Sequence, residues 1–168
     1  MAEGLDTGPL YARRMTPVGP RDTAGELHDR LSVLGAEVLV ETLDRLPALV
    51  PQPQEDALAT FAPKIERAHG RVDFTRTAVE LDRQIRAMTP WPGGYVERAE
   101  GPLKILEAHP IAYAVGPHAP GTLLSTDPLL VACGEGALRL LTVQAAGRRP
   151  VSADAFVNGA RLSKGDKL

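Results

Sequence analysis

The chain has 168 residues, 43% of them hydrophobic and 24% charged, a composition that allows a folded core and excludes disorder throughout. No apolar run approaches the roughly 18–20 residues that a membrane-spanning helix needs, and the N-terminus lacks the pattern of a secretory signal, so we expect a cytoplasmic protein with no membrane partner. The formal net charge of −2 excludes a uniformly basic surface, although the charge is unevenly distributed along the chain.

The opening segment combines a turn-rich loop, residues 4–9, with a short extended stretch over residues 10–15. A single strand is not stable by itself in water. We therefore expect this segment to be the last part of a sheet whose other strands lie upstream, as the end of a larger domain.

A long amphipathic helix is predicted to follow. Thr23 and Glu26 have the spacing of a capping box, in which each side chain accepts a hydrogen bond from the other residue's backbone amide. The helix continues toward Pro47, and its apolar residues recur at helical spacing. They are Leu27, Leu31, Leu34 and Val38. We expect this stripe to pack against another part of the protein.

Residues 50–72 show neither a helical nor a strand period and contain several prolines, so they are predicted to form a linker between residues 1–49 and residues 73–168. Lys64, Arg67, His69 and Arg71 place positive charge along its second half. This charge is suited to following a phosphate backbone, and equally to keeping a linker solvated.

The region 73–168 is predicted to begin with a short helix, capped by Thr77 and Glu80 and stopped by the Pro- and Gly-rich residues 89–94. One face of this helix is predicted to be apolar, with Ala78, Leu81, Ile85 and Met88. Trp91 in that turn is interpreted as a hydrophobic corner residue, with base stacking as the alternative. Short strands and a closing helix over residues 153–158, ended by Gly159, then indicate a small barrel. The predicted strands are residues 95–98, 103–108, 111–115, 122–125, 129–133 and 137–144.

The residues offer few catalytic candidates. The four histidines are far apart in sequence and lack ligand spacing, so no metal site is expected. Cys133, the single cysteine, has apolar neighbours that favour a buried, unreactive thiol. Asp6, at a glycine-bounded turn, has two interpretations: a structural turn residue, or a carboxylate that orients water or transfers a proton.

Basic residues are concentrated in the last thirty residues, where only Asp154 and Asp166 oppose them. Charge alone leaves open whether this tail is a solvated surface or a binding site for a phosphate backbone. The basic residues after position 145 are Arg148, Arg149, Arg161, Lys164 and Lys167.

Together, seven short motifs in order resemble the methionyl-tRNA formyltransferase family, from a point inside its catalytic domain to its C-terminus. Each motif is weak separately, but their order and intervals match. The motifs are residues 4–8 (GLDTG), 22–27 (DTAGEL), 61–65 (FAPKI), 83–87 with 90–93 (RQIRA, PWPG), 120–123 (PGTL), 144–149 (QAAGRR) and 158–162 (NGARL).

This resemblance implies an α+β chain: the tail of a doubly wound formyltransferase domain (loop, strand and helix), a linker, and an OB-like open β-barrel that holds tRNA. The family transfers a formyl group from 10-formyltetrahydrofolate to the amino group of methionyl-initiator tRNA. The resemblance implies a catalytic role for Asp6, in a set with an Asn and a His, and makes Leu5, Thr7 and Gly8 the residues that shape the folate-site loop.

The resemblance also favours tRNA contacts by the basic residues of the linker and tail. These are Lys64, Arg67, Arg71, Arg148, Arg149, Arg161, Lys164 and Lys167. Such contacts position RNA without reading its sequence. The expected protein is a monomer with no DNA partner and no metal.

The Asn and His partners and the other folate-site strands belong to upstream family sequence, so we expect the isolated chain to be inactive. Two alternatives remain: a stand-alone tRNA-binding module without catalysis, and part of a formyltransferase that acts on an amino sugar.

Overall fold

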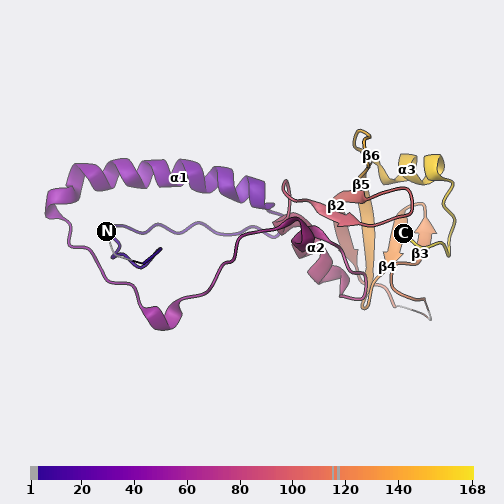
Figure 1. Ribbon diagram of the computed structural model, residues 1–168, viewed down its shortest axis with the longest axis horizontal. Coiled ribbons are helices and arrows are strands. Elements are labelled where there is room, and N and C mark those ends of the chain that lie inside the picture. Colours follow the sequence, from indigo (N-terminus) through magenta and orange to yellow (C-terminus); the bar gives the residue numbers. More distant parts are fainter. Residues whose placement is uncertain (1–3, 115, 117) are drawn as a thin grey trace. The chain divides into compact units, whose positions relative to one another are not determined.

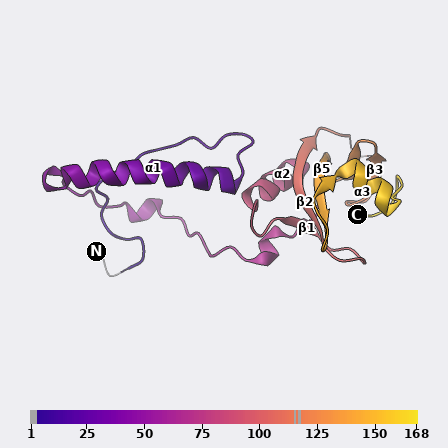
Figure 2. The ribbon, with the colours of Figure 1, turned by 90° about the horizontal axis from the view of Figure 1, so that it is seen from above.

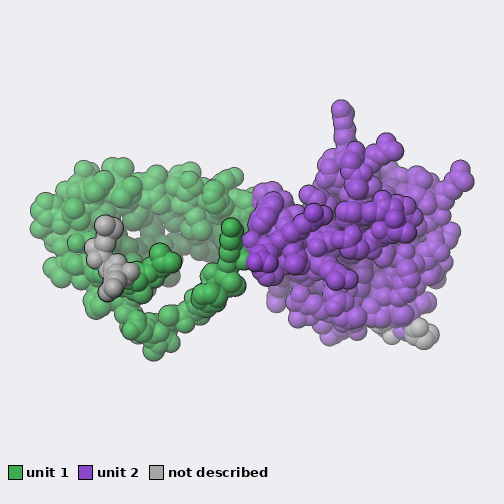
Figure 3. Space-filling model, in the orientation of Figure 1, with its two compact units in different colours: residues 1–64 green, residues 65–168 purple. Residues whose placement is uncertain are grey.

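A computed structural model describes residues 4–114, 116 and 118–168. The chain forms two compact units, residues 1–64 and residues 65–168 (Figure 3). Their division falls after Lys64, inside the segment 50–72 that the sequence predicts as a linker. Within the described part of the chain, no helix has both the length and the apolar character needed to cross a bilayer.

The first unit is built around one long helix, α1 (Ala24–Arg45), with short 3₁₀ turns η1 (Leu46–Ala48) and η2 (Asp56–Leu58) after it (Figure 1). The predicted capping box is present, with Thr23 accepting from the Glu26 amide and Glu26 accepting from the Thr23 amide. None of the 22 residues of α1 is buried, and Leu31 and Leu43 are 46% and 57% exposed. The stripe is therefore only partly covered: Leu27, Leu34 and Val38 are half-buried, and Leu31 is exposed.

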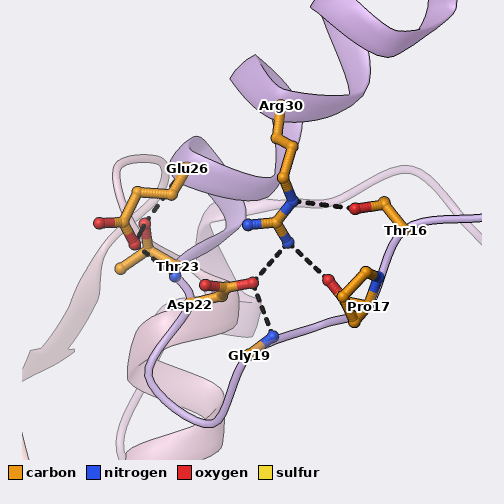
Figure 4. Close-up of polar contacts among 7 residues, drawn as sticks. All are labelled: Thr16, Pro17, Gly19, Asp22, Thr23, Glu26 and Arg30. Carbon is orange, nitrogen blue, oxygen red and sulfur yellow. Dashed lines mark hydrogen bonds and ion pairs between the residues drawn. The ribbon is translucent and has the colours of Figure 1, made fainter.

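Arg30 fastens the segment before α1 to the first turns of the helix (Figure 4). Its guanidinium donates to the Thr16 hydroxyl at 3.1 Å, the Pro17 carbonyl at 2.7 Å and the Asp22 carboxylate at 2.6 Å. The same carboxylate accepts from the Gly19 amide at 2.7 Å. The hydrogen bond with Asp22 raises the pKa of Arg30, which keeps the guanidinium charged.

The second unit is an open antiparallel sheet with two helices. The strands run in the order β1-β2-β5-β4-β3, and β6 pairs with β5. Helix α2 lies beside β1 and β2, and α3 lies beside β5 and β6, in both views (Figures 1 and 2). The elements are η3 (Arg67–Gly70), α2 (Ala78–Ala87), β1 (Gly94–Val96), β2 (Leu103–Ile111), β3 (Leu123–Thr126), β4 (Leu129–Ala132), β5 (Ala137–Ala145), β6 (Val151–Ser152) and α3 (Ala153–Ala160).

A single main core joins the sheet to both helices of this unit. Leu81 and Ile85 of α2 are 0% and 1% exposed, which confirms the predicted apolar face of this helix. They pack in the same cluster as Ile105, Val143 and, from α3, Val157. The Thr77–Glu80 capping box that starts α2 is also present.

Three local predictions differ from the structure. Gly159 does not end the last helix, which continues to Ala160 and is capped by Arg161 in the left-handed conformation (φ 53°). Ile111 ends β2 and begins no new strand, while Val115 lies outside the described residues. Trp91 is not a buried corner, because it is 61% exposed. Neighbouring Pro92 and Gly93 are buried in its place, so the turn packs through its backbone.

Candidate functional site

The loop over residues 4–8 is held in shape by side chains. Thr7 Oγ1 donates to the Gly4 carbonyl at 3.1 Å, which closes the turn. Gln54 Nε2 donates to the carbonyls of Asp6 at 2.8 Å and Gly8 at 2.7 Å. The paired backbones of Leu10 and Gln52 add two hydrogen bonds beside this contact. The loop is thus attached to the segment after α1 by bonds that the sequence pattern did not indicate.

Asp6 is exposed at the tip of this loop and has a positive φ of 56°. Aspartate tolerates this conformation better than most residues, but it still costs about 1–2 kcal/mol. Its backbone carbonyl accepts the Gln54 bond, which leaves the carboxylate facing solvent. Leu5 beside it is 95% exposed. Within the described residues no side chain is placed to position or activate this carboxylate for acid–base chemistry.

The basic residues Arg67 and Arg71 lie at the β1 edge of the sheet. The Arg67 guanidinium is 5.9 Å from the centre of the Tyr95 ring, within cation–π range. Arg71 forms a parallel bridge with Tyr95, and the next amide, Val72 N, donates to the Tyr95 carbonyl at 2.8 Å. Both cations belong to the segment 50–72 predicted as a linker: Arg67 lies in η3, and Arg71 lies just after η3, where it pairs with β1.

A polar row continues from this edge across the sheet. Tyr95 pairs with Lys104, and Lys104 pairs with Gln144, so the three side chains share one face of strands β1, β2 and β5. Gln144 Nε2 donates to the Arg148 carbonyl at 2.7 Å, which connects the row to the turn after β5. Sequence reasoning missed Tyr95 and Lys104, because only strand register shows that they are neighbours.

The remaining candidate cations do not form one cluster. Arg148 and Arg149 follow β5 in a turn around Gly147, and Arg161 caps α3. Lys164 and Lys167 lie in the C-terminal segment, where Lys167 pairs with Thr122 before β3 and donates to the Pro120 carbonyl at 2.6 Å. Lys64 belongs to the other unit. Within the described part of the chain, none of the eight candidate cations has a carboxylate oxygen within the 4 Å of a direct ion pair.

A cleft of about 420 Å³ opens beside the turn after β5. The pairing of Leu103 with Ala145 brings the loop before β2 against this turn, and α3 closes the third side. Arg98 lines the cleft with its guanidinium 5.2 Å from the centre of the Phe156 ring. Arg98 and Phe156 were not predicted from the sequence. They come close to Arg148 only in the folded sheet, where the pairing of β2 with β5 brings distant segments together.

Other reactive groups are not placed for chemistry. Cys133 is 1% exposed, which confirms the expected buried thiol, and burial raises its pKa to about 11. A thiol with this pKa is not a nucleophile at neutral pH. Among the described residues, no three His, Cys, Asp or Glu side chains are grouped to hold a metal ion.

Comparison with known proteins identifies the architecture. Residues 64–161 match the family described as formyl transferase, C-terminal domain. The chain belongs to the formyl transferase family. The match covers most of the second unit, including α2, all six strands and α3.

Curated relatives match the whole chain. The methionyl-tRNA formyltransferases of Ruegeria pomeroyi and Gluconobacter oxydans are each 45% identical over 168 residues, which is 100% of this chain and 54% of each relative. The chain therefore spans about half the length of the curated relatives it matches.

Solved structures of low sequence identity share the fold. HypX from Aquifex aeolicus in complex with tetrahydrofolic acid has a TM-score of 0.67 at 19% identity, over 99% of this chain and 30% of that one. An N-formyltransferase from Helicobacter canadensis, in complex with folinic acid and dTDP-3-aminofucose, has a TM-score of 0.60 at 16% identity, over 83% of this chain and 52% of that one.

Proposed function

We propose that this chain is the C-terminal portion of a methionyl-tRNA formyltransferase, which transfers a formyl group from 10-formyltetrahydrofolate to the amino group of methionyl-initiator tRNA. The observation that carries this proposal is the 45% identity, along the whole chain, to curated relatives of that name. The tetrahydrofolic acid in the HypX structure supports a folate-type co-substrate.

In this proposal the chain divides into a catalytic remnant (residues 1–49), a linker (residues 50–72) and an OB-like, tRNA-holding barrel (residues 73–168). The exposed apolar residues of α1 support the first assignment. A helix that buries none of its 22 residues gains little from packing in its own unit. It is suited to covering the rest of a larger catalytic domain.

Asp6 is proposed as this portion's catalytic residue, with Leu5, Thr7 and Gly8 shaping the folate-site loop. The isolated chain is proposed to be inactive, because the family's Asp acts together with an Asn and a His. The sole asparagine of this chain, Asn158, lies on α3 of the second unit. Without partners that position the amine and stabilise the oxyanion, the transition state of formyl transfer loses several kcal/mol of stabilisation.

The tRNA is proposed to be held by the basic residues of both units, through contacts to phosphates. The candidates are Lys64, Arg67, Arg71, Arg148, Arg149, Arg161, Lys164 and Lys167. If about four of them contact phosphates at once, the affinity falls about 100-fold between 50 and 200 mM salt. The aromatic ring of Tyr95 and the ammonium of Lys104, in the row beside Arg67, extend this surface across three strands.

The test combines binding and turnover. Methionyl-initiator tRNA is titrated into the 168-residue chain at 50 and 200 mM salt, and formyl transfer from 10-formyltetrahydrofolate is measured with and without a fragment that carries the first half of a curated relative. We expect salt-sensitive binding, and transfer only when the fragment is added. Asp6→Asn should abolish the restored transfer and leave binding unchanged.

Other results favour other functions. Binding without any restored transfer favours a stand-alone tRNA-binding module. No salt-sensitive tRNA affinity favours a formyltransferase for an amino sugar, and the Helicobacter canadensis N-formyltransferase is a neighbour in fold whose structure contains such a sugar, dTDP-3-aminofucose. Transfer by the isolated chain refutes the proposed role of the missing partners.

A further inference from the structure

The cleft beside α3 combines basic and apolar side chains in a space of ligand size. It has a volume of about 420 Å³, which lies in the usual range for small-ligand sites. Two of its lining residues are arginines, Arg98 and Arg148, and its apolar lining includes Leu103 and Phe156. Small residues, among them Ala146, leave the backbone of the walls accessible.

Arg98 is held in place before any ligand binds. Its side chain is only 14% exposed, and its guanidinium stacks over Phe156 at 5.2 Å. A guanidinium held in this way loses little entropy when it forms two parallel bonds to a phosphate or carboxylate. Phe156, which is only partly buried, offers apolar contact to a flat group beside that anion.

Glu100 at the rim is a weak competitor for Arg98. Its carboxylate lies 3.4 Å from the Arg98 guanidinium, and its side chain is 74% exposed. Because the Glu100 carboxylate is mostly in solvent, it can turn away from Arg98 and be replaced by another anion. The two arginines and Glu100 leave the cleft with a net positive charge, so an anion with more acceptor oxygens than one carboxylate is favoured.

We propose that this cleft binds one nucleotide unit, with its phosphate on Arg98 and Arg148 and its sugar or base against Phe156. The inference deepens the proposed function and rests on it, because an RNA chain is one source of such a unit. A free mononucleotide is the other source. Arg98 and Phe156 then provide a positioned contact, in addition to the dispersed phosphate contacts of the exposed lysines and arginines.

Variants at exposed positions test the cleft without disturbing the core. Ala160→Glu places a carboxylate in the cleft lining, where it repels phosphate. Ala155→Glu is the matched control, because it makes the same change on the same helix at an exposed position outside the cleft. Glu100→Gln removes the competing carboxylate of Arg98 and should have the opposite effect. Thermal unfolding of each variant checks that the fold is retained.

The full chain and its variants are titrated with methionyl-initiator tRNA and, separately, with adenosine 5′-monophosphate. The side-chain Nε–Hε signal of Arg98 and the amide of Ala146 are followed by NMR. We expect the tRNA affinity to fall about fivefold or more in Ala160→Glu relative to Ala155→Glu, and to rise in Glu100→Gln. The Arg98 signal should shift on binding. This result supports an RNA nucleotide as the ligand.

Equal tRNA affinity in all three variants excludes RNA as the source. Saturable shifts of Arg98 and Ala146 with adenosine monophosphate then support a free nucleotide, and no shift with either ligand overturns the proposal. The two proposals fail separately. A wild-type chain that does not bind tRNA contradicts the proposed function, while the mononucleotide titration still decides the cleft.

Discussion

Gly134 provides a sharp test of the packing between the start of α2 and the turn before β5. A Cβ at this position would overlap the carbonyl oxygen of Thr75 and lie 2.8 Å from the Thr75 carbonyl carbon. Both atoms belong to backbone, so no side chain can move aside. The φ of Gly134 is not in the left-handed region, and Gly134→Ala therefore tests space alone.

The cost follows from the bonds that hold this contact. Gly134 N donates to the carbonyls of Phe74 at 2.8 Å and Arg76 at 2.9 Å, and Ala78 N donates to the Glu135 carbonyl at 2.9 Å. Separating the two segments weakens the hydrogen bonds of these two donor amides, at about 1 kcal/mol for each amide, and adds about 1–3 kcal/mol of overpacking. We expect Gly134→Ala to lower the free energy of unfolding by about 3–5 kcal/mol.

Gly159→Ala is the matched control in the same unit. Gly159 lies inside α3, and no atom lies within 4 Å of a Cβ built there. Alanine should therefore raise the free energy of unfolding by about 0.5–1 kcal/mol, through higher helix propensity.

Urea unfolding followed by fluorescence measures both variants, because Trp91 is the sole tryptophan and lies in this unit. A loss below about 1 kcal/mol for Gly134→Ala, or a loss for Gly159→Ala, would refute the reasoning.

Three further predictions concern charge and pH. Burial raises the pKa of the Cys133 thiol to about 11, so the unfolded chain loses this proton at a lower pH than the folded chain. The free energy of unfolding should therefore decline between about pH 9 and 11, and the same urea assay should show a smaller decline in Cys133→Ala. Thr77→Ala should cost about 1 kcal/mol. Hydrogen bonds from Thr77 lower the pKa of Glu80, so their contribution to stability is present above about pH 4.5 and is lost as the pH falls through the lowered pKa. The free energy of unfolding, measured as a function of pH, should depend less on pH in Thr77→Ala than in the wild type. Arg67→Gln should reduce the salt slope of tRNA binding by about one, whereas Arg76→Gln, whose guanidinium already lies 3.5 Å from Glu80, should leave it unchanged.

Much of the local structure could be predicted from sequence, since its signals lie within a few residues of one another. Both capping boxes were identified from Thr and Glu three residues apart, and both are present. The apolar period of α2 identified Leu81 and Ile85 as core residues. The helix end at Gly159 was wrong, because an isolated glycine costs a helix only about 1 kcal/mol, which packing of Val157 offsets.

The candidate sites were predictable only in part. Asp6 and the basic residues follow from family motifs, but the bonds from Gln54 that fasten the Asp6 loop join positions nearly fifty residues apart. The exposure of Trp91 was also missed, since a proline- and glycine-rich turn does not show which of its residues face the core.

By itself the sequence determined the helix starts, the strand-rich second half, the buried cysteine and the family. Each depends on neighbours along the chain or on motif order. Tertiary structure alone decided that Arg98, Arg148 and Phe156 share one cleft and that Tyr95 and Lys104 are neighbours. The reason is physical: these residues are brought together by contacts between segments distant in sequence. For Tyr95 and Lys104 the contact depends on strand register, and a shift of one residue in a strand would turn its side chain to the other face of the sheet.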